Sequence, residues 1–457
     1  MSTSLLVAGT SETWWQSSRP KIGGLTAEVR EQILFPHSTD QATNIMHRSK
    51  SAQPEFDYVL LILVASLLGF GLVMLFSASY SIAYAWRDNP LYYFSRQLLW
   101  TILGLIALAI MVNINYRAWE RLAIPILGVT LLVLTVLLII GQPVFGSIRY
   151  FIKGSIQPSE LAKIAIIIYI AAWLAAKGKD LRKVSYGLIP FAVLLGLLVG
   201  LIIIQPDVST ALLIAATALA MFFIAGADLI QIGVLMAMGS LTFGLIMSRF
   251  AHTQDRLQVF IDSLLDPVNS SNFHVRGAIQ ALVEGGFFGT GLSESIHKHW
   301  PGGIPAVHSD SIFAIVGEEL GLIGSLTVIA LFFFFAIRGV RIALRATDSF
   351  GTLLAFGITI WLVLQAFINI AVITATFPFT GIPLPFFSYG GSSMLANLAA
   401  VGILLNISRD GQGGIDLNAY LGFWRRNRRT RLSNTGSRAR PAKRRGNVFA
   451  RTLGRRR

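Results

Sequence analysis

The chain contains no cysteine among its 457 residues, and only 13% of its residues are charged. Without cysteine it can form no disulfide, no thiol nucleophile and no thiolate metal site. Soluble domains typically carry about 25% charged residues, whereas here 54% of the residues are hydrophobic. This composition excludes an ordinary soluble protein and predicts an integral membrane protein.

The two ends of the chain lack long apolar runs. Residues 1–57 have no basic start followed by an apolar core, so they do not resemble a signal peptide and are predicted to be a disordered cytoplasmic tail. Residues 409–457 carry most of the net charge of +15. A basic run beside a membrane gains about 1 kcal/mol per residue from an anionic inner leaflet. We therefore favour a membrane surface over a protein partner, and expect no nucleic acid.

Between the tails, apolar segments recur at membrane-spanning length. A helix needs about 20 apolar residues to cross the hydrocarbon. Ten segments qualify, at about 58–78, 97–114, 121–141, 160–176, 187–205, 208–227, 229–248, 311–338, 350–373 and 391–408. The predicted fold is an all-α, polytopic bundle of about ten transmembrane helices spanning residues 58–408.

Lysine and arginine in the loops set the orientation, because they are enriched on the cytoplasmic side. With the N-terminus inside, the inner segments before the C-terminal tail carry fourteen and the outer segments eight. Ten spans then place both termini in the cytoplasm. Four segments fall on the outer face: 142–159, the turn at 205–207, the long loop 249–310 and the connection that ends near residue 393.

That last connection is the most informative part of the sequence. Residues 381–393 contain three glycines, two prolines and three serines between two apolar segments. Such backbone cannot form a regular helix and cannot face lipid with its polar groups unpaired. We expect it to line a polar cavity, where Ser388 and Ser392 would contact a ligand.

A second polar cluster starts the predicted span at 160–176. Glu160 and Lys163 lie three residues apart, so they share one helix face and can pair. Pro158 suits the first helical turn and Ser159 suits the N-cap. The cluster is either a helix start with an internal ion pair or, with the upstream cations Arg149 and Lys153, one wall of a substrate cavity.

A third cluster, Gln205-Pro206-Asp207, predicts the end of one helix and the start of another. Pro206 interrupts the preceding helix, and Asp207 would cap the following one through its free amides.

The long loop 249–310 holds further acidic and basic side chains. Its composition, with phenylalanine, tryptophan and glycine, indicates an ordered segment. Asp266 precedes a proline and is either a turn residue or a general base close to Arg256 and Arg276. Spacing alone does not decide between these readings.

Metal binding has weak support in the pattern. His297, His299, His308 and Asp310 lie near one another in sequence but lack a helical metal-binding pair. Carboxylate oxygens of Asp266 suit Mg²⁺ or Mn²⁺ held together with substrate phosphates.

Together these segments resemble the SEDS family of bacterial cell-wall polymerases. The resemblance covers about residues 58–408 and lies in Gln157-Pro158-Ser159-Glu160 with Lys163, Gln205-Pro206-Asp207, Asp266-Pro267, His308 and Asp310 with 317–321, and 381–393. Ser209, Phe273, Ser309 and Ser311 depart from the usual family residues, but every charged motif position is kept.

The resemblance implies a peptidoglycan glycosyltransferase that polymerises lipid II on the outer face of the bacterial cytoplasmic membrane. It implies that Asp266 is the catalytic carboxylate and that a divalent cation, Mg²⁺ or Mn²⁺, takes part, without an organic cofactor. Substrate contacts are expected from Arg149, Lys153, Glu160, Lys163, Arg256, Arg276, His308, Asp310, Ser388 and Ser392. The implied partners are a class B penicillin-binding protein and other division proteins.

Four other functions are weighed at this level. The long terminal extensions favour the FtsW-like division branch, at the septum, over a RodA-like elongation polymerase. A lipid II flippase would need polar groups through the membrane depth, whereas those identified cluster at the outer ends of spans. A scaffold for the transpeptidase would not need Asp266. A transporter of small solutes is disfavoured because no broken mid-membrane helix is evident.

Overall fold

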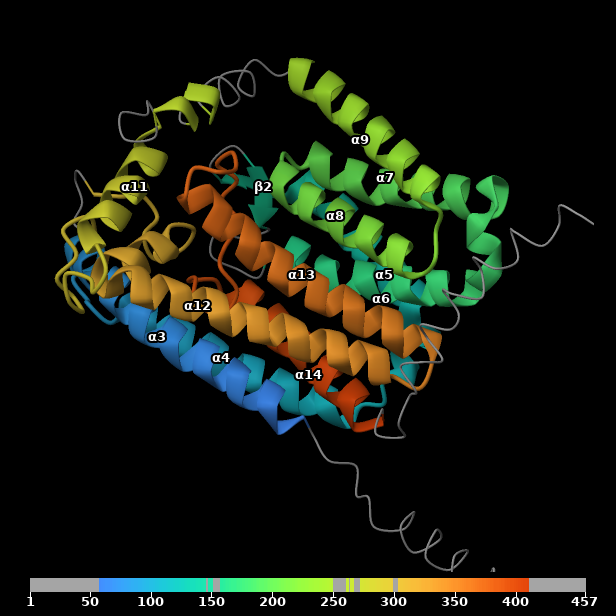
Figure 1. The fold of residues 1–457 in the computed structure, drawn as a ribbon, viewed down its shortest axis with the longest axis horizontal. Helices are drawn as coiled ribbons and strands as arrows, with labels where there is room; N and C mark the ends of the chain where they lie inside the picture. The colour runs from blue at the N-terminus through green and yellow to red at the C-terminus, as the bar shows by residue number, and fades with distance from the viewer. Residues whose placement is uncertain are drawn as a thin grey trace, which may run out of the picture. The chain divides into compact units, whose positions relative to one another are not determined.

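The computed structural model describes residues 57–144, 147–150, 157–249, 260–262, 264–266, 272–298 and 303–410. The predictions for the tails 1–56 and 411–457 lie outside these ranges. Within them the chain is an all-α membrane bundle, as predicted (Figure 1). Eight helical stretches are long and apolar enough to cross a membrane: α3 Tyr58–Arg87, α4 Tyr92–Asn113, α5 Arg117–Ile140, α6 Pro158–Lys177, η2 with α7 Val184–Ile204, α12 Ile312–Arg345, α13 Ser349–Ile373 and α14 Gly391–Asp410.

The two remaining predicted spans are shorter. The segment predicted at 208–227 forms α8, Val208–Ile224, and the segment predicted at 229–248 forms α9, Leu229–Arg249. Helix α8 has 17 residues, and the apolar part of α9 is limited to Leu229–Thr242. The helices are present where expected, and a count of ten spans stays a prediction.

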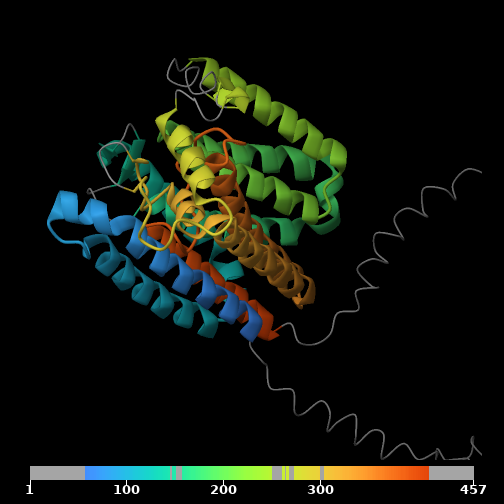
Figure 2. The same ribbon diagram turned by 60° about the vertical axis from the view of Figure 1, so that its left-hand side comes forward.

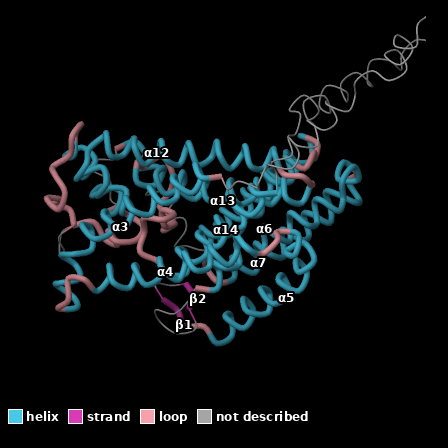
Figure 3. Tube along the Cα trace, turned by 90° about the horizontal axis from the view of Figure 1, so that it is seen from below, coloured by secondary structure: helices cyan, strands magenta, loops and turns pink. Residues whose placement is uncertain are grey.

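One small element was not predicted. Strands β1, Gln142–Val144, and β2, Ser147–Tyr150, form an antiparallel hairpin in the connection between α5 and α6 (Figure 3). The pairing is irregular between Gln142 and Pro143, where proline has no N–H to donate. Strands of three or four residues are too short to give a periodic signal in the sequence.

Burial separates the central helices from the outer ones. The most apolar window of α14 is 83% buried and those of α6 and α13 are 61% buried, against 22% for α4 and α5. Helix α14 contacts α4, α6, α12 and α13, and it lies beside the α3–α4 pair in Figure 2. The polar segment that precedes α14 is therefore attached to the centre of the bundle.

The two ends of the bundle bury charge differently. Near the start of α5, Arg117 binds Asp348 and Asp410, both at 3.0 Å, and these three side chains stay between 33% and 47% exposed. Among the described residues, the charged side chains that are buried are Glu160, Lys163, Asp207, Lys298, Glu318 and Glu319. All of them lie on or beside the segments that the sequence assigns to the outer face.

Helix α12 is interrupted at Gly321, where φ is 66° and ψ is −160°. The carbonyl oxygens of Glu318 and Glu319 accept hydrogen bonds from the amides of Thr290 and Gly291, at 2.9 and 3.0 Å. These hydrogen bonds take the place of the intrahelical bonds that the carbonyl groups of Glu318 and Glu319 lose at the break. This break was not evident in the sequence, because a single glycine inside an apolar run gives little warning of one.

The amides beyond the break are paired in the same way. Leu322 and Ile323 donate to the carbonyl oxygens of Gly286 and Phe287, at 2.9 and 3.4 Å. The segment 286–291 follows α11, Phe273–Gly285. The prediction that the long loop is an ordered segment is therefore confirmed for this part of it. Non-helical backbone is tolerated at membrane depth where other protein groups satisfy it.

We predict that Gly321→Ala destabilises the protein by about 3 kcal/mol, because its backbone conformation is almost exclusive to glycine. An added Cβ would also lie 2.5 Å from the Gly289 amide nitrogen and 2.6 Å from the Phe287 oxygen. Thermal unfolding of the detergent-solubilised protein measures the effect. The control is Gly128→Ala in α5, where a Cβ meets nothing within 4 Å and helix propensity alone predicts a gain of up to about 1 kcal/mol. Equal unfolding midpoints for the two variants would contradict the prediction.

Candidate functional site

The connection between α13 and α14, residues 374–390, is non-helical and buried at its centre, as its composition predicts. Phe386 and Phe387 are 2% and 0% exposed. We call this segment the α13–α14 loop. Its polar backbone needs partners in place of water, and these partners include most of the described residues that the sequence marks as functional.

Two amide side chains of α13 hold the first part of the loop. Gln365 Nε2 donates to the Pro383 oxygen at 2.9 Å. Asn369 Nδ2 donates to the oxygens of Ile382 and Asp310, both at 2.8 Å. The loop is thereby tied to the turn that precedes α12.

Ser388 holds the second part of the loop. Its Oγ accepts from the Leu384 amide at 2.7 Å and donates to the Ser309 oxygen at 2.6 Å. From α4, Gln97 donates to the Ser388 oxygen at 3.2 Å and accepts from the Gly390 amide at 3.1 Å. The side chain of Ser388 is thus already bonded on both sides within the protein.

Ser392 plays a comparable part at the start of α14. Its Oγ accepts from the Gln157 amide at 2.7 Å, next to the start of α6. This bond connects the α13–α14 loop with the second predicted cluster. That Ser388 and Ser392 contact substrate stays a prediction.

The predicted pairing of Glu160 with Lys163 is confirmed. Lys163 Nζ lies 2.9 Å from Glu160 Oε1, and the two side chains are 2% and 6% exposed. The same ammonium donates to Gln365 Oε1 at 3.0 Å and lies 5.2 Å from the centre of the Trp361 ring. Burial of both charges makes this pair costly to break from one side.

The predicted helix cap at Ser159 is wrong. Helix α6 begins at Pro158, so the N-cap position falls on Gln157, which makes no side-chain capping bond. Ser159 lies within the first turn and accepts from Gln157 Nε2 at 2.9 Å. Proline at the first helical position places the start of the helix two residues earlier than expected.

The predicted cap at Asp207 is confirmed. Helix α7, Ile189–Ile204, ends before Pro206, and Asp207 accepts from the amide and the hydroxyl of Thr210, at 3.4 and 3.0 Å. Asp207 is buried, so the cap also gives the amide and the hydroxyl of Thr210 a hydrogen-bond partner inside the apolar bundle.

His308 and Asp310 lie in the turn before α12, against the α13–α14 loop. The imidazole of His308 stacks on Tyr93 with 4.4 Å between ring centres, and its carbonyl oxygen accepts from the Tyr389 amide at 2.8 Å. Burial lowers the pKa of His308 to about 4. Asp310 faces Gly381, where φ is 64° and an added Cβ would lie 3.2 Å from the Asp310 carboxylate.

A further buried pair lies beside the break in α12. Lys298 Nζ donates to Glu319 Oε1 at 3.1 Å, and Ser77 of α3 donates to the same carboxylate at 2.6 Å. The Lys298 and Glu319 side chains are 2% and 0% exposed. The pair attaches the connection between α11 and α12 to α3.

The other predicted site residues belong to different parts of the chain. Asp266 is exposed and follows helical residues 264–265 in the connection between α9 and α11. Arg276 lies in α11 with its guanidinium 5.6 Å from the centre of the Phe273 ring. Arg149 lies in β2, while Lys153 and Arg256 fall outside the described residues. The structure therefore gathers six of the predicted residues at the α13–α14 loop: Glu160, Lys163, His308, Asp310, Ser388 and Ser392.

Sequence reasoning missed the residues that hold this group together. Trp361, Gln365 and Asn369 are spaced four apart on one face of α13, and all three are buried. Polar side chains at that spacing in an apolar span are a recognisable signal. Gln97 and Lys298 give no such signal, because each follows other polar residues in the sequence and no spacing singles it out.

The predicted metal ligands are distributed differently from the expectation. Within the described residues, the histidine and acidic side chains whose ligand atoms converge are Glu284, His297 and Glu318. Asp266, His308 and Asp310 are not part of this group, and His299 lies outside the described residues.

Comparison with known proteins gives a consistent result. The family model of FtsW, RodA and SpoVE, described as cell cycle protein, matches residues 58–412. A probable peptidoglycan glycosyltransferase FtsW of Trichlorobacter lovleyi is 40% identical over 360 residues, which cover 78% of this chain and 93% of the relative. Stage V sporulation protein E of Bacillus subtilis is 37% identical over 359 residues, which cover 77% and 97%.

Solved structures agree with these relatives. A chain from a peptidoglycan synthase complex that coordinates polymerization and crosslinking superposes with a TM-score of 0.64 at 25% identity, covering 79% of this chain and 99% of that chain. The crystal structure of the Rod shape determining protein RodA of Thermus thermophilus superposes with a TM-score of 0.58 at 25% identity, covering 80% and 100%.

We predict that Lys163→Met lowers the free energy of unfolding by about 3–5 kcal/mol, because it leaves the Glu160 carboxylate buried without its cation. The double substitution Glu160→Gln with Lys163→Met should lose less than the single one, since no unpaired charge remains. Chemical denaturation of the detergent-solubilised protein measures both. The control, Lys177→Met at the other end of α6, should cost below about 1 kcal/mol. A double variant less stable than Lys163→Met would refute this account.

We also predict that acid destabilises the protein through His308. Its pKa is about 4 when folded against 6.5 for the ordinary imidazole, so below pH 6.5 the unfolded chain binds a proton that the folded chain does not. The free energy of unfolding should fall by up to about 3 kcal/mol as the pH drops from 6.5 to 4. His308→Phe keeps the stacking and should remove this part of the pH dependence. Unfolding at pH 7.5 and pH 4.5 tests it, and an unchanged pH dependence in the variant would show that His308 is not responsible.

Proposed function

The chain belongs to the FtsW/RodA/SpoVE family, and from this premise we propose that it is a peptidoglycan glycosyltransferase. The observation that carries the proposal is the extent of the match, which takes in every helix from α3 to α14 and every charged cluster described above. The relative from Trichlorobacter lovleyi bears the name of this activity and is matched over 93% of its length.

The proposed reaction joins lipid-linked disaccharides into a glycan strand. The substrate is lipid II, whose disaccharide-pentapeptide is attached to an undecaprenyl pyrophosphate. The acceptor sugar hydroxyl attacks the anomeric carbon of the donor, a new glycosidic bond forms, and the bond to the pyrophosphate oxygen breaks. Asp266 takes the hydroxyl proton, and the lipid pyrophosphate leaves. Its exposed position in the α9–α11 connection supports this role, because an acceptor can reach it.

The α13–α14 loop and its neighbours form the fixed wall of the proposed substrate site. Glu160 and Lys163 are buried against Gln365, so they position the loop. Contacts with the pyrophosphate are assigned to cations between the spans, Arg149, Lys153, Arg256 and Arg276, because a guanidinium group binds two phosphate oxygens at once and an ammonium group attracts them as a point charge. His308 and Asp310 are tied to the fixed wall through the Tyr389 amide and the Asn369 side chain.

The placement of buried charge favours chemistry at one face over passage through the membrane. A flippase path needs polar groups along the membrane depth. In the described part of the chain, the buried charges of the spans lie in the first two turns of α6, at the N-cap of α8 and by the third turn of α12, and the amides of α13 lie in its last three turns. All these positions belong to the same predicted outer face.

Partner and location follow from the same premise. A similar chain comes from a peptidoglycan synthase complex that coordinates polymerization with crosslinking, which supports a class B penicillin-binding protein as the partner. The FtsW name of the relative from Trichlorobacter lovleyi supports work at the division septum in the bacterial cytoplasmic membrane over elongation. A divalent cation, Mg²⁺ or Mn²⁺, would assist by neutralising the pyrophosphate.

The test is polymerisation of lipid II by the purified protein with its transpeptidase partner and Mn²⁺ or Mg²⁺. We predict that Asp266→Asn slows strand formation by about 10²–10⁴-fold, the range that a general base supplies. The matched control is Asp262→Asn, an exposed carboxylate one helical turn upstream, which should keep near wild-type activity.

The outcomes separate the alternatives. Strands from the wild type and from Asp262→Asn, but not from Asp266→Asn, support the polymerase and its base. Equal activity of all three would move the base elsewhere, with Asp310 the next residue to test. If none polymerises where a related enzyme does, the proposal fails, and lipid II transport in liposomes becomes the measurement for the flippase reading.

A further inference from the structure

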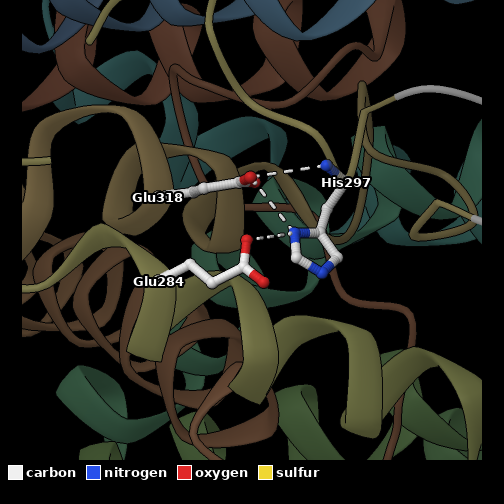
Figure 4. Close-up of side chains that lie close together, drawn as sticks. All are labelled: Glu284, His297 and Glu318. Carbon is white, nitrogen blue, oxygen red and sulfur yellow. Dashed lines mark hydrogen bonds and ion pairs between the residues drawn. The ribbon is translucent and has the colours of Figure 1, made fainter. Parts of the chain in front are cut away.

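Three side chains from three elements meet beside the break in α12. Glu284 comes from the last turn of α11, His297 from the connection between α11 and α12, and Glu318 from α12 (Figure 4). His297 Nδ1 lies 3.1 Å from Glu318 Oε1 and 3.5 Å from Glu284 Oε2. The ligand atoms all lie within 4.8 Å of one another.

A single proton on His297 Nδ1 cannot satisfy both carboxylates of this group. The Nδ1 atom carries at most one hydrogen, yet two carboxylates face it. In the described ranges, neither Glu284 nor Glu318 makes an ion pair with lysine or arginine, and the nearby Lys298 is bound to Glu319. With neutral imidazole the group carries two negative charges, one of them on a fully buried side chain. Burying such charge without a cation is costly.

We propose that Glu284, His297 and Glu318 bind a divalent transition-metal ion. Two ligand atoms held about 2.1 Å from one ion, at tetrahedral or octahedral angles, lie about 3.0–3.4 Å apart. The separation of Nδ1 from Glu318 Oε1, 3.1 Å, falls within this range, and its separation from Glu284 Oε2, 3.5 Å, lies 0.1 Å beyond it, on the side chain that is exposed and can rotate inward. One imidazole with two carboxylates suits Zn²⁺ or Mn²⁺ better than Mg²⁺, and the order of affinity places Zn²⁺ above Mn²⁺.

The surroundings orient the ligands as metal sites require. The Ile296 amide donates to Glu318 Oε1 at 2.8 Å, and the Ser295 hydroxyl donates to the other oxygen of the same carboxylate. Such outer-shell bonds fix the direction of a ligand's lone pairs. Glu284 is 48% exposed and His297 14% exposed, so an ion can enter from the Glu284 side, and Glu284 can rotate to complete the coordination.

An ion at this position has a structural consequence. Glu284 precedes the segment 286–291, whose backbone completes the break in α12, and Glu318 lies just before that break. The ion would link the end of α11 to α12 next to the hydrogen bonds between segment 286–291 and the break. The inference does not depend on the proposed function, and the site is separate from Asp266.

The experiment uses the full-length protein in detergent, first stripped with a chelator. Zn²⁺, Mn²⁺ and Mg²⁺ are titrated separately, with bound metal measured by mass spectrometry after dialysis and the unfolding midpoint by thermal scanning. We expect one equivalent of Zn²⁺, weaker Mn²⁺ binding, and a rise of the midpoint with both. Glu284→Gln should raise the dissociation constant by about 100-fold or more, since loss of an outer-shell partner alone costs about 10–100-fold.

Two control variants make the result specific. Glu294→Gln changes an exposed glutamate of the same connection and should keep the full metal response, as should Asp266→Ala. Loss of the response in Asp266→Ala but not in Glu284→Gln would overturn the proposal and place the ion at Asp266. No metal response in the wild type would also overturn it. Polymerisation is not measured, so failure here is distinguishable from failure of the proposed function.

Discussion

The structure depends on one constraint: backbone amides and carbonyls that leave a helix at membrane depth must find partners within the protein. Lipid offers none, and each unpaired group costs several kcal/mol. The chain leaves regular helix at two such places, the break at Gly321 and the α13–α14 loop. At the first, the backbone of 286–291 pairs with the broken turn. At the second, side chains of Gln97, Gln365, Asn369 and Ser388 supply the partners.

These two solutions explain where charge is buried. A side-chain amide that holds backbone must itself be oriented, and Gln365 is oriented by Lys163 and by the Trp361 indole, at 3.0 and 2.9 Å. Lys163 in turn requires Glu160. Beside the break, Glu318 and Glu319 accept from Ser295, Lys298 and Ser77. The buried ions therefore help to hold non-helical backbone in place. This role differs from direct contact with substrate.

The sequence was sufficient for features that depend on neighbouring residues. Apolar length located the helices, the i,i+3 spacing predicted the Glu160–Lys163 pair, and Pro206 with Asp207 predicted a helix end and a cap. Features that depend on distant segments were not predictable in this way. The bonds of Gln97 to a loop almost 300 residues away, the pairing of 286–291 with α12 and the meeting of Glu284 with His297 leave no local pattern. The Ser159 cap failed because Pro158 set the helix start.

The two ends of the bundle differ in how they hold charge, and this difference bears on function. At the end carrying Arg117, the ions are partly exposed and hold helix termini together. At the other end they are buried around two non-helical segments, and the exposed side chains of the α9–α11 connection, including Asp266, come before both segments in the chain. A glycosyl transfer between two lipid-linked substrates needs a fixed wall and an accessible base, because orientation supplies much of the rate. The buried ion pairs hold the loop that forms the fixed wall, and the exposed Asp266 supplies the accessible base, so the two features together favour catalysis at this face.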